Sequence, residues 1–192
     1  MDQELRWIEA ARQGDKSAFG RLVEAYQRPV FNLTYRMLRQ QEEAEDAAQE
    51  TFLRAYRKLN SYDPAHKFST WLLSIASHYC IDLLRRRRLT WLSLEEEGLP
   101  PGAMKSEQPG PEHRAMQGER EAQIEALLDA LAPDYRAVVL LHYWHGLSYE
   151  EIAQTTDSTV SAVKSRLFRA RRMLAERIRE EQIPIDAVAL AL

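Results

Sequence analysis

The residues with the clearest chemistry are the basic ones near the end of the sequence. Between Ser158 and Arg179 there are seven lysines and arginines and one acid, whereas the whole chain has a net charge of -3. Guanidinium and ammonium groups bind phosphates, and guanidinium also donates paired hydrogen bonds to base edges in the DNA major groove. This local charge predicts a nucleic-acid contact that the net charge alone would argue against. The alternative interpretation is a basic surface helix without a ligand.

Candidate metal and catalytic residues are few and isolated. His142 and His145 are three residues apart, and His78 is two residues from Cys80. Neither pair has the further ligands that a zinc site requires. The sequence has no glycine-rich phosphate loop and no recognisable Ser-His-Asp or Cys-His arrangement. We therefore expect no metal site, no cofactor and no enzymatic activity.

Composition points to the compartment. The single cysteine excludes an internal disulfide framework and suits a reducing environment. Charged residues interrupt the first turns after Met1, and no apolar stretch approaches the roughly 18 residues that a membrane span needs. We expect a cytoplasmic protein with no membrane insertion of its own.

Glycine and proline divide the chain into two parts. Four glycines and four prolines lie between Gly98 and Gly118, and apolar periodicity lapses there. We therefore expect a module over residues 1–92, a linker over 93–120 and a second module over 121–183. On both sides of the linker apolar residues recur with helical spacing, and strand-like alternation is absent. The predicted fold class is all-α, with two small helical domains joined by a flexible linker.

The C-terminal module is predicted to hold a helix-turn-helix. Pro133 suits the first turn of a helix that closes at Gly146. The sequence from Ser148 to Glu151 fits a capping box for a short helix, and Ser158 is expected to cap the final helix to about Arg179. A short helix, a brief turn and a basic helix are typical of a DNA-binding unit.

The final helix has two distinct sides. Its apolar residues form one stripe: Val160, Val163, Leu167, Ala170 and Leu174. The residues on the opposite side, with Arg166 beside them, are Lys164, Ser165, Phe168 and Arg169. They supply donors for phosphates and base edges and an aromatic edge for a thymine methyl.

The N-terminal module is predicted to contain four helices. Asp15 is expected to cap the second, and Pro29 to kink or restart it. The first is expected from about Gln3 to Gln13, and the second from just after Asp15 to Met37. The third is expected from Glu42 to Leu59, and the fourth from Ser69 or Thr70 to the arginines at 85–88.

The third and fourth of these helices carry candidate binding faces. On the third helix, the side away from the core holds Leu53, surrounded by Asp46, Gln49 and Glu50. This pattern favours a docking surface for a basic protein only slightly over the alternative, a single exposed leucine without a partner. On the fourth helix the face away from the core is predicted to hold Ser74, Ser77, His78, Ile81 and Arg85. With the preceding polar loop, this face suits a strand with unstacked bases. The alternative is an ordinary helix with a basic end that favours its macrodipole.

The succession of motifs resembles the extracytoplasmic-function sigma factors of the sigma-70 family. The matching motifs are Ala18-Phe19 with Leu22-Val23 and Tyr26, then Ala44 to Phe52, Phe68 to Leu72, Asp82 to Arg86, Leu131 to Pro133, Gly146 to Ala153 and Val163 to Arg171. Each string is moderately specific, and their order in two linked helical modules is strongly specific.

The resemblance implies a promoter-recognition subunit of RNA polymerase. For docking on the core polymerase it implies Asp46, Gln49, Glu50 and Leu53. For the minus-ten element it implies Asn60, Tyr62, His66, Lys67, Trp71, Ser74, His78 and Arg85. For the minus-thirty-five element it implies Lys164, Ser165, Arg166, Phe168 and Arg169. It also implies an anti-sigma partner and a linker that threads toward the RNA exit path. Ser161-Ala162 replaces the usual Gly-Thr of the family, so a threonine contact to the DNA backbone is expected to be missing.

Two other functions fit parts of the sequence. A stand-alone helix-turn-helix regulator would use the same C-terminal helix, but it would not need the acidic patch or the basic fourth helix. A helical adaptor would not need the arginines after Ser158. Association with core polymerase separates the sigma factor from both alternatives.

Overall fold

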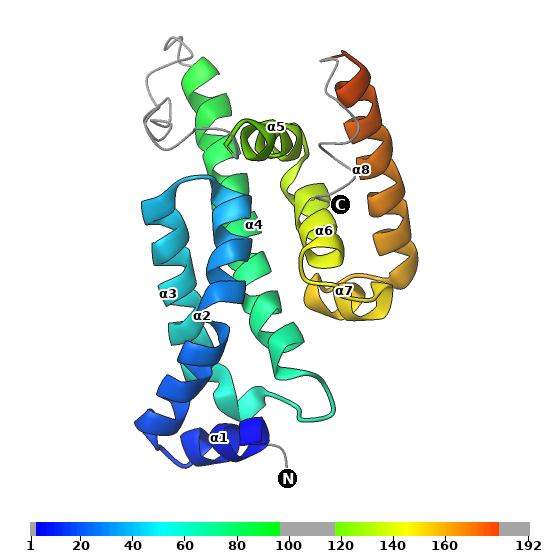
Figure 1. The fold of residues 1–192 in the computed structure, drawn as a ribbon. Helices are drawn as coiled ribbons and strands as arrows, with labels where there is room; N and C mark the ends of the chain where they lie inside the picture. Colours follow the sequence, from blue (N-terminus) through cyan, green and yellow to red (C-terminus); the bar gives the residue numbers. More distant parts are fainter. Residues whose placement is uncertain (1–2, 97–117, 181–192) are drawn as a thin grey trace.

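The structure, a computed structural model, describes residues 3–96 and 118–180, and every regular element in these two ranges is helical (Figure 1). This confirms the predicted fold class. The elements are α1 (Gln3–Arg12), α2 (Lys16–Leu38), α3 (Gln41–Lys58), the 3-10 turn η1 (Leu59–Ser61), α4 (Phe68–Glu96), α5 (Gly118–Asp129), α6 (Pro133–Tyr143), α7 (Tyr149–Thr155) and α8 (Val160–Glu180).

The start of α2 follows the local sequence. Gly14 has a φ of +96°, a conformation that favours glycine, and the Asp15 carboxylate then accepts hydrogen bonds from the amides of Ser17 and Ala18. The expectation that Pro29 restarts the helix is wrong, since α2 is one continuous helix. Buried residues before and after the proline, among them Leu22 and Val30, anchor both halves in the same core.

Two helices of the C-terminal module begin as the sequence predicts. Pro133 stands in the first turn of α6, and Ser148 with Glu151 forms the complete capping box of α7. The cap of α8 differs from the prediction. The Thr159 hydroxyl accepts from the amide of Ala162, while the Ser158 hydroxyl lies 2.8 Å from that of Thr156. Ser158 is therefore engaged in the turn and is not the cap.

The fourth helix is longer than predicted. It begins at Phe68 and continues beyond the arginines to Glu96, four residues into the predicted linker range. Gly118, the first residue of α5, also lies inside that range. The linker range 93–120 and the domain bounds on either side of it stay predictions, and residues 97–117 lie outside the described part of the chain.

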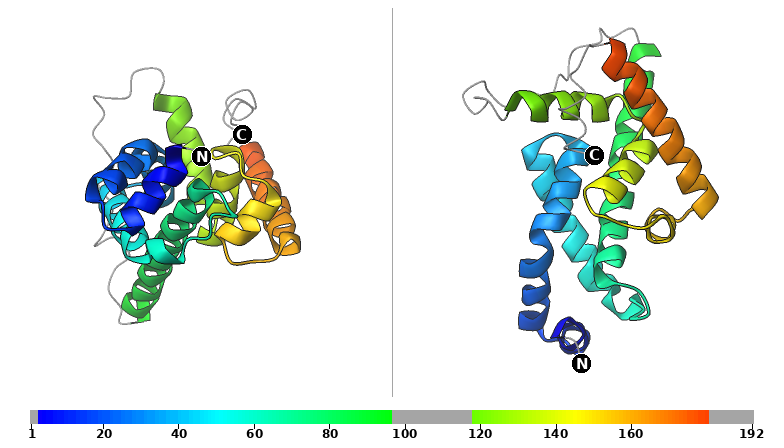
Figure 2. Two further views of the ribbon diagram at one scale, coloured as in Figure 1. Left: turned by 90° about the horizontal axis from the view of Figure 1, so that it is seen from below. Right: turned by 45° about the vertical axis from the view of Figure 1, so that its right-hand side comes forward.

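The two modules pack against each other, with α4 between them (Figures 1 and 2). One face of α4 contacts α2 and α3, and α6 and α7 of the C-terminal module also contact α4. Ser77 and Ile81, predicted to be exposed, are consequently buried, with exposed fractions of 0% and 6%. The buried apolar residues of both modules form one continuous cluster.

Candidate functional site

The outer face of α3 is an acidic surface with a leucine at its centre. Leu53 is 51% exposed, and Asp46 and Gln49 are exposed beside it. Glu50 is half-buried, and its carboxylate accepts a hydrogen bond of 2.7 Å from the Nε of Arg54. A large apolar side chain that stays in water among polar groups is available for a protein partner. We call Asp46, Gln49, Glu50 and Leu53 the α3 patch.

Tyr56 extends this surface, although the sequence reasoning missed it. Its ring is 38% exposed and makes an edge contact with Phe19, at 4.9 Å between ring centroids. Tyr56 follows Leu53 by three residues, a spacing that places two side chains on neighbouring parts of one helical face. That spacing is the signal by which it could have been found.

The loop between α3 and α4 is built around Tyr62. Only 4% of Tyr62 is exposed, and its hydroxyl donates a 2.6 Å hydrogen bond to the carbonyl of His66. The Arg12 guanidinium donates to the backbone carbonyls of Leu59 and Tyr62 from the α1 side. Tyr62 therefore supports the loop from inside, and its ring is not presented to a base in this conformation.

Other residues predicted for the minus-ten element lie at the surface. Asn60, His66 and Lys67 are exposed in the loop, and His78 and Arg85 are exposed on α4. The remaining two are half-buried: Trp71 and Ser74. The Ser74 hydroxyl donates to the carbonyl of Trp71, while the indole packs against the Tyr62 and Phe68 rings.

The two basic groups of this region are already paired. Lys67 Nζ lies 2.8 Å from the Glu151 carboxylate, and Arg85 donates to both oxygens of Asp134 at 2.9 and 3.0 Å. The hydrogen bond from Lys67 lowers the pKa of Glu151, which keeps that carboxylate charged. Both acids belong to the C-terminal module, a juxtaposition that the sequence did not reveal.

The residues of α8 that were predicted to read DNA lie on the side of the helix away from the core. Phe168 is 67% exposed, Lys164, Ser165 and Arg169 are exposed, and Arg166 is half-buried at the edge. The opposite stripe of α8 holds four buried residues: Val163, Leu167, Ala170 and Leu174. Arg171 is held to α6 by a 2.7 Å hydrogen bond from its Nε to the Tyr143 hydroxyl. The face thus combines cations, a hydroxyl and an aromatic ring that is largely exposed.

Neither a metal centre nor a membrane-spanning helix is present in the residues that the structure describes, 3–96 and 118–180. In that part of the chain no group of three or more histidine, cysteine, aspartate and glutamate side chains is arranged to hold a metal ion. Among the described helices none is long and apolar enough to cross a membrane.

Comparisons with known proteins follow the two-module division. Residues 22–90 match the family described as Sigma-70 region 2, and residues 121–174 match that described as Sigma-70, region 4. The chain is 35% identical over 178 residues to the ECF RNA polymerase sigma factor SigW of Bacillus subtilis, covering 90% of this chain and 95% of that protein. It is 34% identical to the RNA polymerase sigma-H factor of Pseudomonas aeruginosa, over 90% of this chain and 92% of that protein.

The fold is similar to that of a protein solved in complex with a partner. The structure of CnrH in complex with the cytosolic domain of CnrY matches with a TM-score of 0.68 and 25% identity, covering 93% of this chain and 99% of CnrH. Two helical modules that match sigma-70 regions 2 and 4 define a sigma factor. The chain belongs to the extracytoplasmic-function (ECF) group of RNA polymerase sigma factors. It binds core RNA polymerase and directs the initiation of transcription at promoters.

The alternative of a stand-alone helix-turn-helix regulator is not favoured. Such a protein would not require an N-terminal module, whereas the region 2 match covers most of the described N-terminal residues.

Proposed function

We propose that the α3 patch is the surface that docks on core RNA polymerase. A partly apolar face ringed by Asp46, Gln49 and Glu50 suits a basic partner, because complementary charge speeds encounter and an apolar centre supplies affinity. Leu53, with half of its surface in water, is the group with the most apolar area to bury. Tyr56 would enlarge the contact at its edge.

We further propose that α8 reads the minus-thirty-five element and that the α3–α4 loop with α4 binds the minus-ten element. Lys164 and Arg169 would contact the duplex from α8, with Phe168 available to a thymine methyl. Asn60, His66 and Lys67 would contact the minus-ten strand, and Tyr62 would hold the loop in shape. Each promoter element would then be contacted by a different module.

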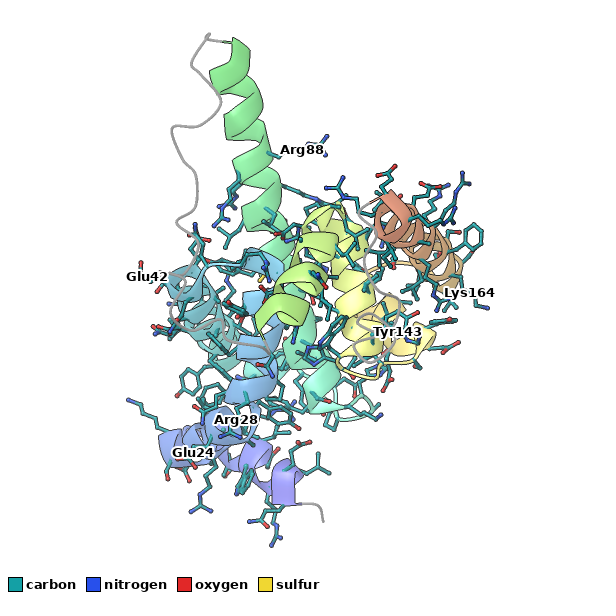
Figure 3. All side chains as sticks on the ribbon, turned by 45° about the horizontal axis from the view of Figure 1, so that its top comes forward. Glu24, Arg28, Glu42, Arg88, Tyr143 and Lys164 are labelled. Carbon is teal, nitrogen blue, oxygen red and sulfur yellow. The ribbon has the colours of Figure 1, made fainter. Side chains whose placement is uncertain are left out.

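One observation carries the proposal. The α3 patch and the exposed face of α8 lie on opposite sides of the molecule, as the positions of Glu42 on α3 and Lys164 on α8 show (Figure 3). A promoter-recognition subunit must hold the polymerase and the DNA at once. Opposed faces of opposite charge character permit this without competition for one surface.

The proposal also covers the setting of the protein. We place it in the cytoplasm, without catalysis of its own, and under the control of an anti-sigma factor. The complex of CnrH with the cytosolic domain of CnrY supports control by a protein partner, because this chain covers 99% of CnrH. The resemblance does not identify that partner.

Reconstitution with core polymerase tests this function. The purified chain should bind the core enzyme at low salt and support run-off transcription from a subset of promoters. Replacing Asp46 and Glu50 with lysine should abolish both activities and leave helicity intact. A matched control reverses the charge of Glu24, an exposed acid on α2, and should retain both activities. Wild-type affinity for the core enzyme in the double variant would overturn the docking assignment.

A further inference from the structure

The start of the α3–α4 loop is tied to α1 by one side chain (Figure 1). The Arg12 guanidinium donates from its Nε to the Leu59 carbonyl at 3.2 Å and from its Nη2 to the Tyr62 carbonyl. Leu59 ends α3 and Tyr62 ends η1, where carbonyls lack partners within the helix. One guanidinium can serve two such acceptors because its donors form a rigid planar fork. Arg12 therefore holds the backbone at both ends of η1.

Hydrogen bonds within the loop give it its local shape. The Tyr62 hydroxyl donates to the His66 carbonyl at 2.6 Å, and the His66 amide donates to the Asp63 carbonyl at 3.1 Å. The Asp63 carboxylate also accepts from the Ala65 amide at 2.9 Å. These bonds join loop residues to one another, whereas Arg12 joins the loop to a different helix.

The helix that carries Arg12 is itself firmly attached to the module. Its buried apolar residues, Ile8 and Ala11, are 2% and 4% exposed. Near its other end, the Glu4 carboxylate accepts a hydrogen bond from the Tyr26 hydroxyl of α2. The Arg12 side chain is 20% exposed, so most of it lies against protein and not in water. α1 is therefore a fixed support from which Arg12 reaches the loop.

The two residues between the anchored carbonyls, Asn60 and Ser61, are exposed. An asparagine amide both donates and accepts, so it can pair with the edge of an unstacked base if its position is well defined. We infer that Arg12 is a positioning residue for base recognition in the minus-ten element, because it holds the backbone on both sides of Asn60. The inference rests on the proposed contact of Asn60 with the minus-ten strand.

Loss of Arg12 is expected to loosen η1 without undoing the loop. The Leu59 carbonyl keeps the Tyr62 amide as a donor at 3.2 Å, whereas the Tyr62 carbonyl loses the donor from Arg12. The Tyr62 ring stays in the core, with 4% of the residue exposed. The expected defect is therefore imprecise placement of Asn60, which should weaken discrimination between bases and leave the fold and core binding intact.

Selection from a randomised DNA pool measures this discrimination. The probe is a duplex with a randomised single-stranded segment, bound by the chain assembled with core polymerase and sequenced after recovery. Asn60→Ala should reduce the preference for the selected base at one position by about five- to thirtyfold. Arg12→Met should reduce the preference at that same position by about three- to tenfold, with unchanged affinity for core polymerase. The control Arg6→Met, at an exposed arginine of α1, should keep the preference.

Arg12→Lys distinguishes positioning from a direct contact with phosphate. Lysine keeps the charge but not the planar fork, so this variant should keep the salt dependence of DNA binding and lose base preference. In the Asn60→Ala background it should have no additional effect at the affected position, because the residue through which it acts is gone. Should Arg12→Met fail to fold, Arg12→Lys provides the comparison with wild type.

The outcomes separate this inference from the proposed function. Wild-type base preference in the Arg12 variants, or losses that add to that of Asn60→Ala, would overturn the inference. An equal loss on every sequence with a weaker salt dependence would overturn it too, since Arg12 would then be a phosphate contact. A failure of the proposed contact gives a different result, because Asn60→Ala itself would then keep the wild-type base preference.

Discussion

Arg136 of α6 donates a hydrogen bond of 2.8 Å from its Nη1 to the backbone carbonyl of Met37 on α2. Its Nε donates to the carbonyl of Leu128, and its Nη1 lies 3.1 Å from the Asp129 carboxylate. Arg136 is only 7% exposed, and burial lowers its pKa. A buried cation thus joins α5, α6 and α2 at the contact between the modules.

Replacement of Arg136 by methionine should therefore destabilise the protein by about 2 to 4 kcal/mol, because the buried Met37 carbonyl loses the donor from Arg136 and the Leu128 carbonyl keeps only the amide of Leu131. Urea unfolding of the full chain measures the change. Arg179→Met, at an exposed position near the end of α8, should change the stability by less than about 0.5 kcal/mol. A loss below about 1 kcal/mol for the Arg136 variant would contradict a structural role for this contact.

Leu53 offers a test in which stability and function separate. Leu53→Ala should leave the free energy of unfolding within about 0.5 kcal/mol of wild type, because half of the side chain is already in water. It should weaken binding to core polymerase by about 1 to 3 kcal/mol, since the leucine is the apolar centre of the proposed contact. Leu5→Ala, on the 36% exposed Leu5 of α1, is the control expected to bind normally. Equal affinities for the two variants would count against the assignment.

Arg169 and Lys164 are expected to contact different parts of the DNA. Arg169→Ala should weaken binding to particular minus-thirty-five sequences by about 1 to 3 kcal/mol if the guanidinium contacts a base. Lys164→Ala should weaken binding to all sequences by a similar factor and reduce the salt dependence, as expected of a phosphate contact. Affinities of polymerase complexes for a panel of promoter duplexes measure both effects. A uniform loss for Arg169→Ala would make it a phosphate contact instead.

Substitutions of Ser148 test how much its helix cap contributes to the stability of the helix-turn-helix. Ser148→Ala removes the hydroxyl that accepts from the Glu151 amide and should destabilise the protein by about 0.5 to 2 kcal/mol. Ser148→Thr preserves the acceptor and should restore most of the loss. Thermal unfolding of the three proteins gives the comparison. If the Ser148→Ala and Ser148→Thr proteins were equally stable, the cap would not contribute to stability.

His145 predicts a dependence of stability on pH. Burial, and then the charge of Arg36, lower its pKa to about 4, compared with an ordinary value of about 6.5. The unfolded chain therefore takes up a proton first, so this contribution is fully present above pH 6.5 and is lost as the pH falls toward 4. The loss should reach about 1 to 3 kcal/mol. Glu151, whose pKa is lowered, loses its contribution only in stronger acid.

Unfolding measured across this range in wild type and in His145→Gln isolates the histidine. The difference between the two proteins should shrink as the pH falls from 7 to 5, because glutamine does not titrate. A difference that stays constant over this interval would show that His145 is as easily protonated in the folded protein as in the unfolded one.

The amino-acid sequence was enough to predict the helices, the order of the modules and most of the exposed faces. The helical spacing of apolar residues predicted α3 and α8 with their exposed sides, because a residue's face on a helix depends only on its position in the repeat. Local hydrogen-bonding groups predicted the Asp15 cap and the Ser148 capping box for a similar reason, since the partner lies within three residues. The motifs in these elements were sufficient to indicate the family.

Which of these faces remain exposed depends on how the two modules pack against each other. Ser77 and Ile81 lie on the side of α4 that periodicity assigned to solvent, and they are buried because a second module covers that side. The pairing of Arg85 with Asp134 joins residues 49 positions apart, and no repeat within one helix encodes it. Contacts between distant segments depend on how whole elements pack, and a single sequence read helix by helix does not contain that arrangement.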